Sequence, residues 1–161
     1  MTAPLTLDFV TGTMKGFGTV EQVGKNRFKV TTTPDRLRDA IMHVQAMLGC
    51  DRLITVSAVD NSRTLELHYH FTGQHRTVIT IATGLSRDKP VLATLSDLLL
   101  PAGLYERQIH DLFGISFTGH PALKKLVLNE DFPENEYPLR KDWKPAPGRS
   151  YGGTKERREP P

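Results

Sequence analysis

Alternating apolar and polar residues predict strands in the first half of the chain. Between residues 27 and 32, Phe28 and Val30 alternate with polar neighbours, as in a half-buried strand. Three further strands, separated by polar turns, are predicted over residues 53–59, 64–71 and 76–82. Their short connections favour an antiparallel meander. Residues 1–26 have no clear period, and we interpret them as a lead-in with one edge strand near 19–23.

A helix is predicted between the first strand and the meander. Thr33 and Pro34 have the form of a helix cap and first turn, and Gly49 ends the helix. Apolar residues recur between them at steps of three and four, namely Leu37, Ala40, Ile41, Val44, Met47 and Leu48. This amphipathic helix should lie on the sheet. The strand over 64–71 should bury one face and leave the other wet, since its apolar residues alternate with Glu66, His68 and His70.

The second half of the chain predicts two helices and a loop region. Residues 94–97, Thr-Leu-Ser-Asp, have the form of a capping box in its acidic variant and predict a short helix that Pro101 ends. The second helix is predicted over 102–113, with Gly114 as its stop. One side of it should be formed by Leu104, Ile109, Leu112 and Phe113. Glycines and prolines then leave at most a short strand at 126–128.

These elements indicate an α+β fold, with a two-layer, mostly antiparallel sheet packed by helices. An irregular loop region and an extended C-terminal tail follow it. We divide the chain into an α+β domain at 1–100, a helix with interface loops at 101–143, and a basic tail rich in proline and glycine at 144–161. No run approaches the ~18 consecutive apolar residues of a membrane-spanning helix, so we expect any membrane association to come through a partner.

Cys50 is the only cysteine in the sequence. A single thiol excludes an internal disulfide and an iron–sulfur cluster that this chain alone would ligate through cysteines. Because Cys50 follows the predicted helix end at Gly49, we interpret it as a small buried apolar residue rather than a nucleophile. A lone thiol also fits a reducing, cytoplasmic setting.

The net charge of +3 comes from the tail. Residues 144–161 contain five basic and two acidic side chains, whereas residues 1–143 contain sixteen of each. A neutral body argues against a broad nucleic-acid-binding face. A small nucleic-acid-binding domain that uses the basic tail stays open as an alternative. By its composition, the tail on its own should be disordered.

Two groups of titratable residues are candidates for a metal or catalytic site. His68 and His70 share a strand face, but two ligands are too few for a metal site, and an exposed polar face is the favoured interpretation. Glu106, His110 and Asp111 lie on adjacent helical turns, yet Asp111 is about 100° further round and no nucleophile accompanies the three. The sequence therefore predicts no catalytic, cofactor-binding or metal-binding residue. A soluble enzyme that uses Glu106 or His110 remains the third alternative.

Charged residues between 105 and 143 are better explained as an ordered interface. A carboxylate beside an arginine, as in Glu106-Arg107 and Arg140-Lys141-Asp142, can fix a loop or a partner through charge-assisted bonds. On an ordinary solvated face such pairs contribute only ~0–1 kcal/mol. Rigid turns that present arginines and aromatic rings are typical of binding hot spots. The nearby turn and aromatic residues are Phe113, Gly114, Phe117, Gly119, Pro121, Tyr137, Pro138 and Trp143.

A long, gapped pattern runs through residues 100–143. It consists of Glu106-Arg107, Asp111-Leu112-Phe113-Gly114-Ile115, Phe117, Gly119-His120-Pro121 and Pro138-Leu139-Arg140-Lys141-Asp142. In order and spacing this pattern resembles the signature of the roughly 30-kDa subunit of respiratory complex I, the NADH dehydrogenase of respiratory chains. The family includes the equivalent subunit of membrane-bound energy-converting hydrogenases.

The resemblance implies a peripheral-arm subunit that has no cofactor of its own. It would brace the large subunit, which is hydrogenase-like or of the 49-kDa type, beside the small iron–sulfur subunit. Iron–sulfur clusters and, in hydrogenases, a nickel–iron centre would belong to those partners. The whole would be a membrane-bound, ion-translocating oxidoreductase, with this subunit at the cytoplasmic face. The implied partner interface is Glu106, Arg107, Asp111, Phe113, Gly114, Gly119, His120, Pro121, Pro138, Leu139, Arg140, Lys141 and Asp142.

The resemblance also suggests roles for these residues. Carboxylates in the loop or on the partner would be anchored by Arg107, Arg140 and Lys141. Those arginines would be oriented by Glu106 and Asp111. Tight turns would be permitted by Gly114 and Gly119, and the exit of the loop would be fixed by His120-Pro121.

Departures from the signature bear on the branch of the family. Gln108 stands where the quinone-reducing branch often has Glu, and Glu136-Tyr137 replaces a Gly-His pair before Pro138. Residues 129–134, Asn-Glu-Asp-Phe-Pro-Glu, resemble a run associated with the hydrogenase branch. The resemblance thus favours an energy-converting hydrogenase. The alternative is the equivalent subunit of an NADH or deazaflavin:quinone dehydrogenase.

Overall fold

A computed structural model describes residues 4–73 and 76–147. The chain forms helices α1 to α3, a short 3-10 helix η1 and strands β1 to β7. In chain order these are α1 (Leu7–Thr13), β1 (Thr19–Gly24), β2 (Arg27–Thr32), η1 (Pro34–Arg36), α2 (Leu37–Leu48), β3 (Arg52–Asp60), β4 (Thr64–Thr72), β5 (Val78–Ser86), β6 (Val91–Ala93), α3 (Ala102–Phe113) and β7 (Ser116–Thr118).

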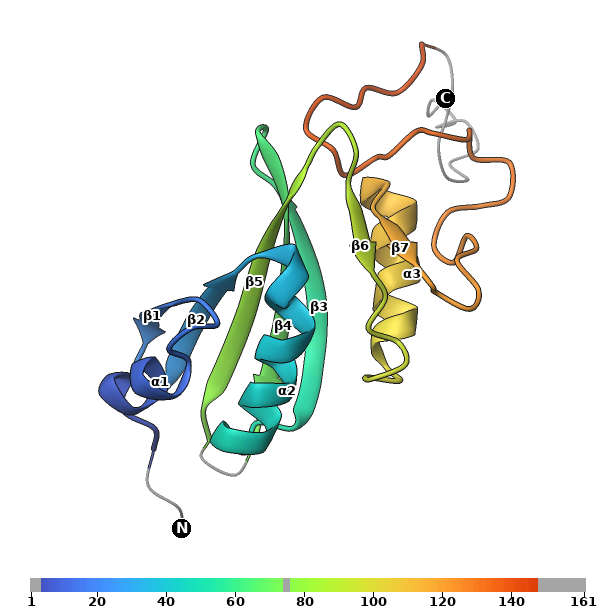
Figure 1. Cartoon of the computed structure of the whole chain (residues 1–161). Coiled ribbons are helices and arrows are strands. Elements are labelled where there is room, and N and C mark those ends of the chain that lie inside the picture. Colours follow the sequence, from blue (N-terminus) through green and yellow to red (C-terminus); the bar gives the residue numbers. More distant parts are fainter. Residues whose placement is uncertain (1–3, 74–75, 148–161) are drawn as a thin grey trace, which may run out of the picture.

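The main sheet has five strands in the order β1-β2-β5-β4-β3, and α2 lies across one of its faces (Figure 1). All neighbouring strands are antiparallel except β2 and β5, which pair in parallel. The predicted α+β fold, with its antiparallel meander β3-β4-β5, is therefore confirmed. The third meander strand was predicted over residues 76–82. It is shifted toward the C-terminus, since it begins at Val78 and continues to Ser86.

Periodicity explains the core between the sheet and α2. Every second residue of β4 is buried, and the polar residues between them are half-buried on the opposite face. The buried side chains of α2 are Leu37, Ala40, Ile41, Val44 and Leu48, as its apolar stripe predicts. Gly49 ends this helix in the left-handed conformation at φ 59°. Cys50 behind it is fully buried, as expected, and burial raises the pKa of its thiol to about 11.

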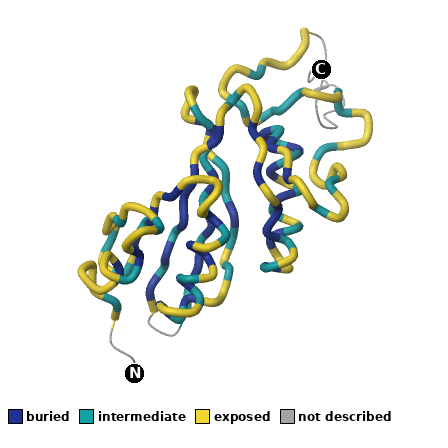
Figure 2. Tube along the Cα trace, in the orientation of Figure 1, coloured by how far each residue is buried: buried dark blue, intermediate teal, exposed yellow. Residues whose placement is uncertain are grey.

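Helix α3 lies beside β3, and residues 119–147 pass around the end of that helix (Figure 1). The Tyr105 hydroxyl donates to the Ile54 carbonyl at 3.0 Å and ties α3 to β3. Next to α3, β6 and β7 form a two-stranded parallel sheet that the sequence did not predict. Burial is concentrated in the sheet, α2 and the inner side of α3, whereas 119–147 is mostly exposed or half-buried (Figure 2).

Three local predictions were wrong. Residues 94–100 form turns instead of a helix, because Asp97 binds Arg38 of α2 at 2.7 Å and the Thr94 hydroxyl binds Glu106. Residues 126–128 are not a strand, since their N–H groups bind a side chain of α3. Leu104 is 60% exposed and does not share the buried side of α3.

Some predictions fall on the ends of the chain. Helix α1 occupies part of the predicted lead-in, and the expected edge strand is present as β1. In residues 4–73 and 76–147, no helix is long and apolar enough to cross a membrane. Most of the basic tail, residues 148–161, lies outside the described residues, so its expected disorder and the nucleic-acid alternative stay predictions.

Candidate partner-binding platform

The signature residues gather around the C-terminal end of α3. Two acidic side chains of this helix are almost fully buried, Glu106 at 0% and Asp111 at 4% exposure. Buried carboxylates are costly unless they are hydrogen-bonded. Each carboxylate binds a loop that is distant in sequence, and together they determine where those loops lie.

Glu106 holds the turn after β6. Its Oε1 accepts the Leu95 N–H at 2.8 Å, and its Oε2 accepts the Thr94 hydroxyl. Burial raises the pKa of Glu106 above its usual value, and these two hydrogen bonds oppose the rise. Glu106 thus joins α3 to the chain between β6 and α3.

Asp111 holds the loop that was expected to form a strand. Its Oδ2 accepts the N–H groups of Leu126, Val127 and Leu128 at 2.6, 2.8 and 3.3 Å. Three successive amides on one oxygen form a backbone nest for an anion. The other oxygen, Oδ1, is buried and has no hydrogen-bond partner in the part of the chain that the structure describes.

Arg107 holds the same loop from the preceding helical turn. Its Nε and Nη2 donate to the carbonyls of Lys124 and Lys125 at 3.1 and 3.0 Å. Residues 107 and 111 are four apart and therefore lie on one face of the helix. Together they fix residues 124–128 along α3.

Arg140 closes the C-terminal end of α3. Its Nε donates to the Phe113 carbonyl at 2.7 Å, and its guanidinium carbon lies 4.9 Å from the centre of the Tyr137 ring. The Leu139 N–H donates to the Leu112 carbonyl at 3.1 Å. Both bonds satisfy carbonyls that the last helical turn leaves unpaired, and a cation here also complements the helix dipole.

Gly114 makes this close approach feasible. It ends α3 with φ 70°, a backbone conformation that residues other than glycine rarely adopt. A Cβ at this position would overlap the Tyr137 ring. The predicted turn role of Gly114 is therefore consistent with the geometry.

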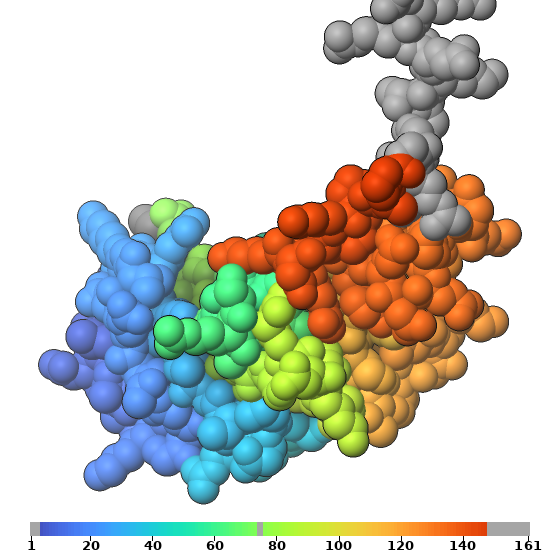
Figure 3. Space-filling model, turned by 90° about the horizontal axis from the view of Figure 1, so that it is seen from above, coloured from blue at the N-terminus to red at the C-terminus, as the bar shows by residue number. Residues whose placement is uncertain are grey.

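An ion cluster attaches residues 140–142 to the main sheet. Arg87 donates to Asp60 at 3.0 and 2.7 Å and to Asp142 at 2.7 Å. Asp60 also accepts the Lys141 N–H at 2.9 Å. The hydrogen bond from Arg87, with help from backbone N–H groups, lowers the pKa of Asp60 to about 2. Figure 3 shows the red-orange C-terminal segment resting against the green β3–β4 turn and the yellow-green chain after β5.

His120 fixes the loop that leaves β7. Its Nδ1 accepts the Ala122 N–H at 3.1 Å, so its Nε2 is the nitrogen that donates to the Gly103 carbonyl at 3.0 Å. Gly119 precedes it at φ 83° and Pro121 follows it. This arrangement agrees with the predicted role of these three residues in the loop's turn and exit.

The geometry corrects several expected roles. Within the described residues, Arg107 and Arg140 bind backbone carbonyls and not carboxylates of the loop, while the alternative of carboxylates on the partner stays a prediction. Glu106 and Asp111 hold backbone segments and do not orient the arginines. Lys141 contributes its backbone N–H to Asp60. Sequence reasoning missed Asp60 and Arg87, which are 27 residues apart and carry no local pattern that would pair them.

We call helix α3 and the loops at its end, residues 124–128 and 137–143, the platform. Apolar side chains are exposed around it. Leu100 is 87% exposed, and the others lie between 43% and 60%: Leu104, Leu126, Val127 and Leu139. We call these five residues the apolar set. Helix α3 and its loops thus present aliphatic groups outward, beside exposed charged side chains.

The two histidines of β4 lie on the sheet face opposite α2 and contact neighbouring polar side chains. His70 lies 2.9 Å from the Thr80 hydroxyl and 3.2 Å from that of Ser57, and His68 lies 3.3 Å from Glu66. Burial lowers the pKa of both rings. Among residues 4–73 and 76–147, no group of three or more His, Cys, Asp or Glu is arranged to hold a metal ion.

Comparison with known proteins identifies the family. The family model described as respiratory-chain NADH dehydrogenase, 30 Kd subunit, matches residues 30–149. The chain belongs to this 30-kDa subunit family. The match begins within β2 and runs to residue 149, so it includes most of the main sheet and the end of α3 with its loops.

Two relatives of the 30-kDa family illustrate the range of similarity. The subunit designated C of the F(420)H(2) dehydrogenase of Methanosarcina mazei is 34% identical over 127 residues, which cover 77% of this chain and 80% of the relative. The subunit designated C of the NADH-quinone oxidoreductase of Jannaschia sp. is 33% identical over 119 residues, which cover 71% of this chain and 56% of the relative. The chain thus spans most of the first relative and a little over half of the second.

Solved structures of similar fold agree with the family assignment. A chain in the structure of the membrane-bound sulfane sulfur reductase, an archaeal respiratory membrane complex, superposes with a TM-score of 0.76 at 24% identity, covering 85% of this chain and 84% of that one. The trypsin-resistant fragment of Nqo5 superposes with a TM-score of 0.60 at 25% identity, covering 68% and 91%. The first of these similarities concerns the fold alone.

Proposed function

We propose that this chain is a non-redox structural subunit in the peripheral arm of a membrane-bound, ion-translocating oxidoreductase. It braces the large catalytic subunit beside the small iron–sulfur subunit, at the cytoplasmic face of the membrane. The iron–sulfur clusters belong to those partners. The observation that carries the proposal is the platform itself, in which the signature charges hold loops in place and the apolar set faces outward.

The physical argument is preorganisation. A loop that is already held in its bound shape loses little entropy on association. Residues 124–128 and 137–143 are held by Arg107, Asp111 and Arg140, so the partner need not order them. Exposed aliphatic groups on such a rigid frame are typical of an interface that excludes water.

The relatives support the class of complex. The two relatives are named as subunits of an F(420)H(2) dehydrogenase and of an NADH-quinone oxidoreductase. Their names favour the dehydrogenase alternative over the hydrogenase branch that residues 129–134 indicated. We therefore propose a complex I-like dehydrogenase, with the hydrogenase as the competing assignment.

Purification of the native complex in a mild detergent tests the proposal. A tag on this chain should recover a large 49-kDa-type subunit and a small iron–sulfur subunit in equal amounts, as measured by mass spectrometry. Absence of nickel by metal analysis would support the dehydrogenase, and stoichiometric nickel would support the hydrogenase. Recovery of this chain alone, under conditions in which the other two subunits stay together, would refute the bracing role.

A further inference from the structure

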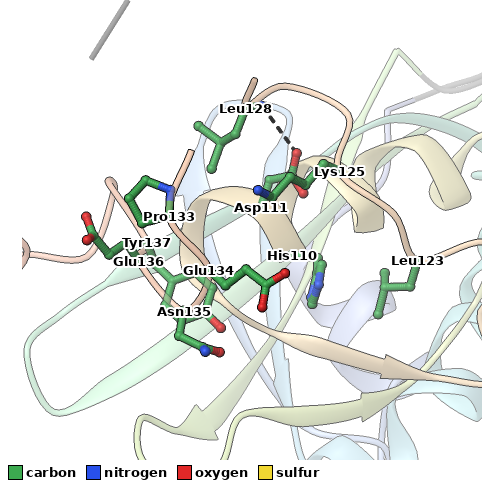
Figure 4. Close-up of a pocket in the computed structure, with 10 residues that line it drawn as sticks. All are labelled: His110, Asp111, Leu123, Lys125, Leu128, Pro133, Glu134, Asn135, Glu136 and Tyr137. Atoms are coloured by element: carbon green, nitrogen blue, oxygen red, sulfur yellow. Dashed lines mark hydrogen bonds between the residues drawn. The ribbon is translucent and has the colours of Figure 1, made fainter. Parts of the chain in front are cut away.

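A pocket of about 270 Å³ lies between the end of α3 and residues 123–137 (Figure 4). Its charged lining residues are Asp111, Glu134 and Glu136 against Lys125. Protein sites for drug-sized ligands start at ~300 Å³, so this volume suits a single side chain better than a cofactor.

The groups that line the pocket mostly accept hydrogen bonds. The Nδ1 of His110 donates to the Ile115 carbonyl at 2.9 Å, which leaves Nε2 of the neutral ring as an acceptor. Glu134 is exposed and has no hydrogen bond to the described residues, and Figure 4 shows its carboxylate turned toward the His110 ring. An occupant that donates several hydrogen bonds would fit these acceptors.

Asp111 provides the second, independent observation. It is only 4% exposed, and its Oδ1 lacks a partner among the described residues, although it carries half of a carboxylate charge. Lys125 forms no ion pair with Asp111, because its ammonium lies against the carbonyls of Phe132 and Glu130, to which it donates at 2.6 and 3.3 Å. Its single positive charge leaves the three acids of the lining in excess. A cation in the pocket need not touch the buried oxygen to be attracted to it, since the field of a poorly screened charge extends over several ångströms.

We propose that this pocket receives a basic side chain of the large partner subunit, with an arginine guanidinium as the best fit. A guanidinium has five donors and no acceptor, which matches the lining. Its aliphatic stem would contact Leu123, Leu128 and Tyr137. The identity of the partner rests on the proposed function, whereas the preference for a cation rests on the pocket alone.

A model compound tests the preference for a cation. The full-length, ¹⁵N-labelled chain is titrated with N-acetyl-arginine amide and, separately, with the neutral isostere N-acetyl-citrulline amide. Arginine should cause saturable amide shifts at residues 126–128 and 134–137 with a dissociation constant of about a millimolar. Citrulline should bind at least about tenfold more weakly. Equal binding of the two compounds, or shifts that do not saturate, would overturn the proposal.

Two substitutions locate the site. Glu134→Gln should weaken the binding of N-acetyl-arginine amide several-fold without unfolding the chain, because Glu134 is exposed and holds no loop. The matched control is Asp131→Asn, another exposed acid, which lies outside the lining of this pocket and should change binding less than twofold. Equal effects of the two variants would overturn the assignment of this pocket.

The partner is tested in the native complex. Glu134→Arg should reduce recovery of the large subunit at least about fivefold, whereas Asp131→Arg should not. Normal recovery with Glu134→Arg would overturn the role in assembly even if the subunit proves to be a brace. If a chain ending at residue 147 binds N-acetyl-arginine amide about tenfold more tightly than the full chain, the basic tail is the occupant and the partner proposal falls. A wild-type chain that recovers no large subunit would refute the bracing function and leave the model-compound result standing.

Discussion

Glu106 combines a charge with complete burial, and its two hydrogen bonds explain why it is tolerated. The bonds to Leu95 and Thr94 compensate for part of the lost hydration, while burial still raises its pKa. The folded state therefore holds this proton to a higher pH than the unfolded state does. Ionisation of Glu106 makes stability fall as the pH rises from its ordinary value near 4.5 through the raised one.

Replacement of Glu106 separates its charge from its hydrogen bonds. Glu106→Gln removes the charge, while its amide oxygen can still accept the Leu95 N–H and its NH2 can donate to the Thr94 hydroxyl oxygen, so that the second bond is kept with its direction reversed. We therefore expect it to be at least as stable as the wild type at pH 7 to 8. Glu106→Ala leaves the Leu95 N–H and the Thr94 hydroxyl unpaired and should cost about 1–3 kcal/mol. Urea unfolding of the three proteins measures this.

The pH dependence provides the control for Glu106. The advantage of Glu106→Gln over the wild type should shrink as the pH falls toward 4.5, since the wild type then gains its proton. If Gln proves as costly as Ala, the carboxylate charge is needed for stability and the explanation from burial is wrong.

Asp60 shows the opposite electrostatics, because its pKa is lowered to about 2, chiefly by Arg87. Its contribution to stability is complete above its ordinary pKa of 3.8 and is lost as the pH falls toward 2. We expect Asp60→Asn to cost on the order of 1–2 kcal/mol at pH 7, allowing for solvent screening at this cluster. The difference between wild type and variant should be constant from pH 7 to about 4 and should decrease below it.

Asp142 is the matched control for Asp60, since both carboxylates bind the same arginine. The Asp142 side chain is 66% exposed, whereas that of Asp60 is 1% exposed. Asp142→Asn should therefore have a clearly smaller effect on the free energy of unfolding. Equal losses would show that Asp60 does not anchor the cluster.

The individual roles in the platform could be foreseen only in part. The sequence indicated that charges, glycines and aromatic residues between 105 and 143 form an ordered interface. The structure shows that these residues hold loops in place, and the interface itself stays a prediction. It also suggested that adjacent Glu106 and Arg107 work as a pair. Neighbours on a helix point about 100° apart, so Glu106 faces the interior while Arg107 reaches outward to the loop. Their true partners, 11 to 18 residues away, follow no local rule.

At the scale of elements, the C-terminal end of α3 is a junction where the helix, the 124–128 loop and the 137–143 segment meet. Gly114 lies at its centre in the left-handed conformation, and the Tyr137 ring occupies the space that a Cβ of residue 114 would need. Gly49 ends α2 in nearly the same conformation, at φ 59°, yet a Cβ there would meet no atom within 4 Å. The two glycines therefore differ in surroundings and not in backbone strain.

This contrast gives a matched pair of substitutions. Gly49→Ala should cost about 1 kcal/mol, the strain of a left-handed alanine. Gly114→Ala adds an overlap with Tyr137 worth about 1–3 kcal/mol, so we expect a total of about 2–4 kcal/mol. Urea unfolding measures both. Equal losses would mean that Tyr137 moves aside freely and does not lock the junction.

Elements with a strong local period were predicted well, and elements made by distant contacts were not. Alternation in β4 and the apolar stripe of α2 predicted the meander and the helix on it. Strands β6 and β7 have three residues each, too few for a period, and their pairing joins segments 25 residues apart. The box at 94–97 failed for a related reason, because Arg38 and Glu106 bind its side chains from distant helices.

At the scale of the whole molecule, the sheet and the platform are tied together at three places. Tyr105 bonds to β3, Arg38 of α2 bonds to Asp97, and Arg87 bridges Asp60 and Asp142. Most of the charged signature residues form hydrogen bonds or ion pairs within the chain. A partner should therefore be bound largely through the apolar set, and charge should matter mainly at the pocket beside Asp111.

The apolar set can be tested without disturbing the fold. Leu104 of α3 is 60% exposed and Met42 of α2 is 49% exposed, so either side chain contributes little to the core. Serine at either position should lower the stability of the isolated chain by no more than about 0.5–1 kcal/mol, mainly through helix propensity. In the native complex, Leu104→Ser should reduce recovery of the large subunit several-fold, because Leu104 belongs to the proposed interface, while Met42→Ser should leave recovery unchanged. Thermal unfolding and quantitative mass spectrometry measure the two effects. Normal recovery with Leu104→Ser would place the interface elsewhere on the molecule, and an equal loss with both variants would show that the effect is not specific to the surface around Leu104.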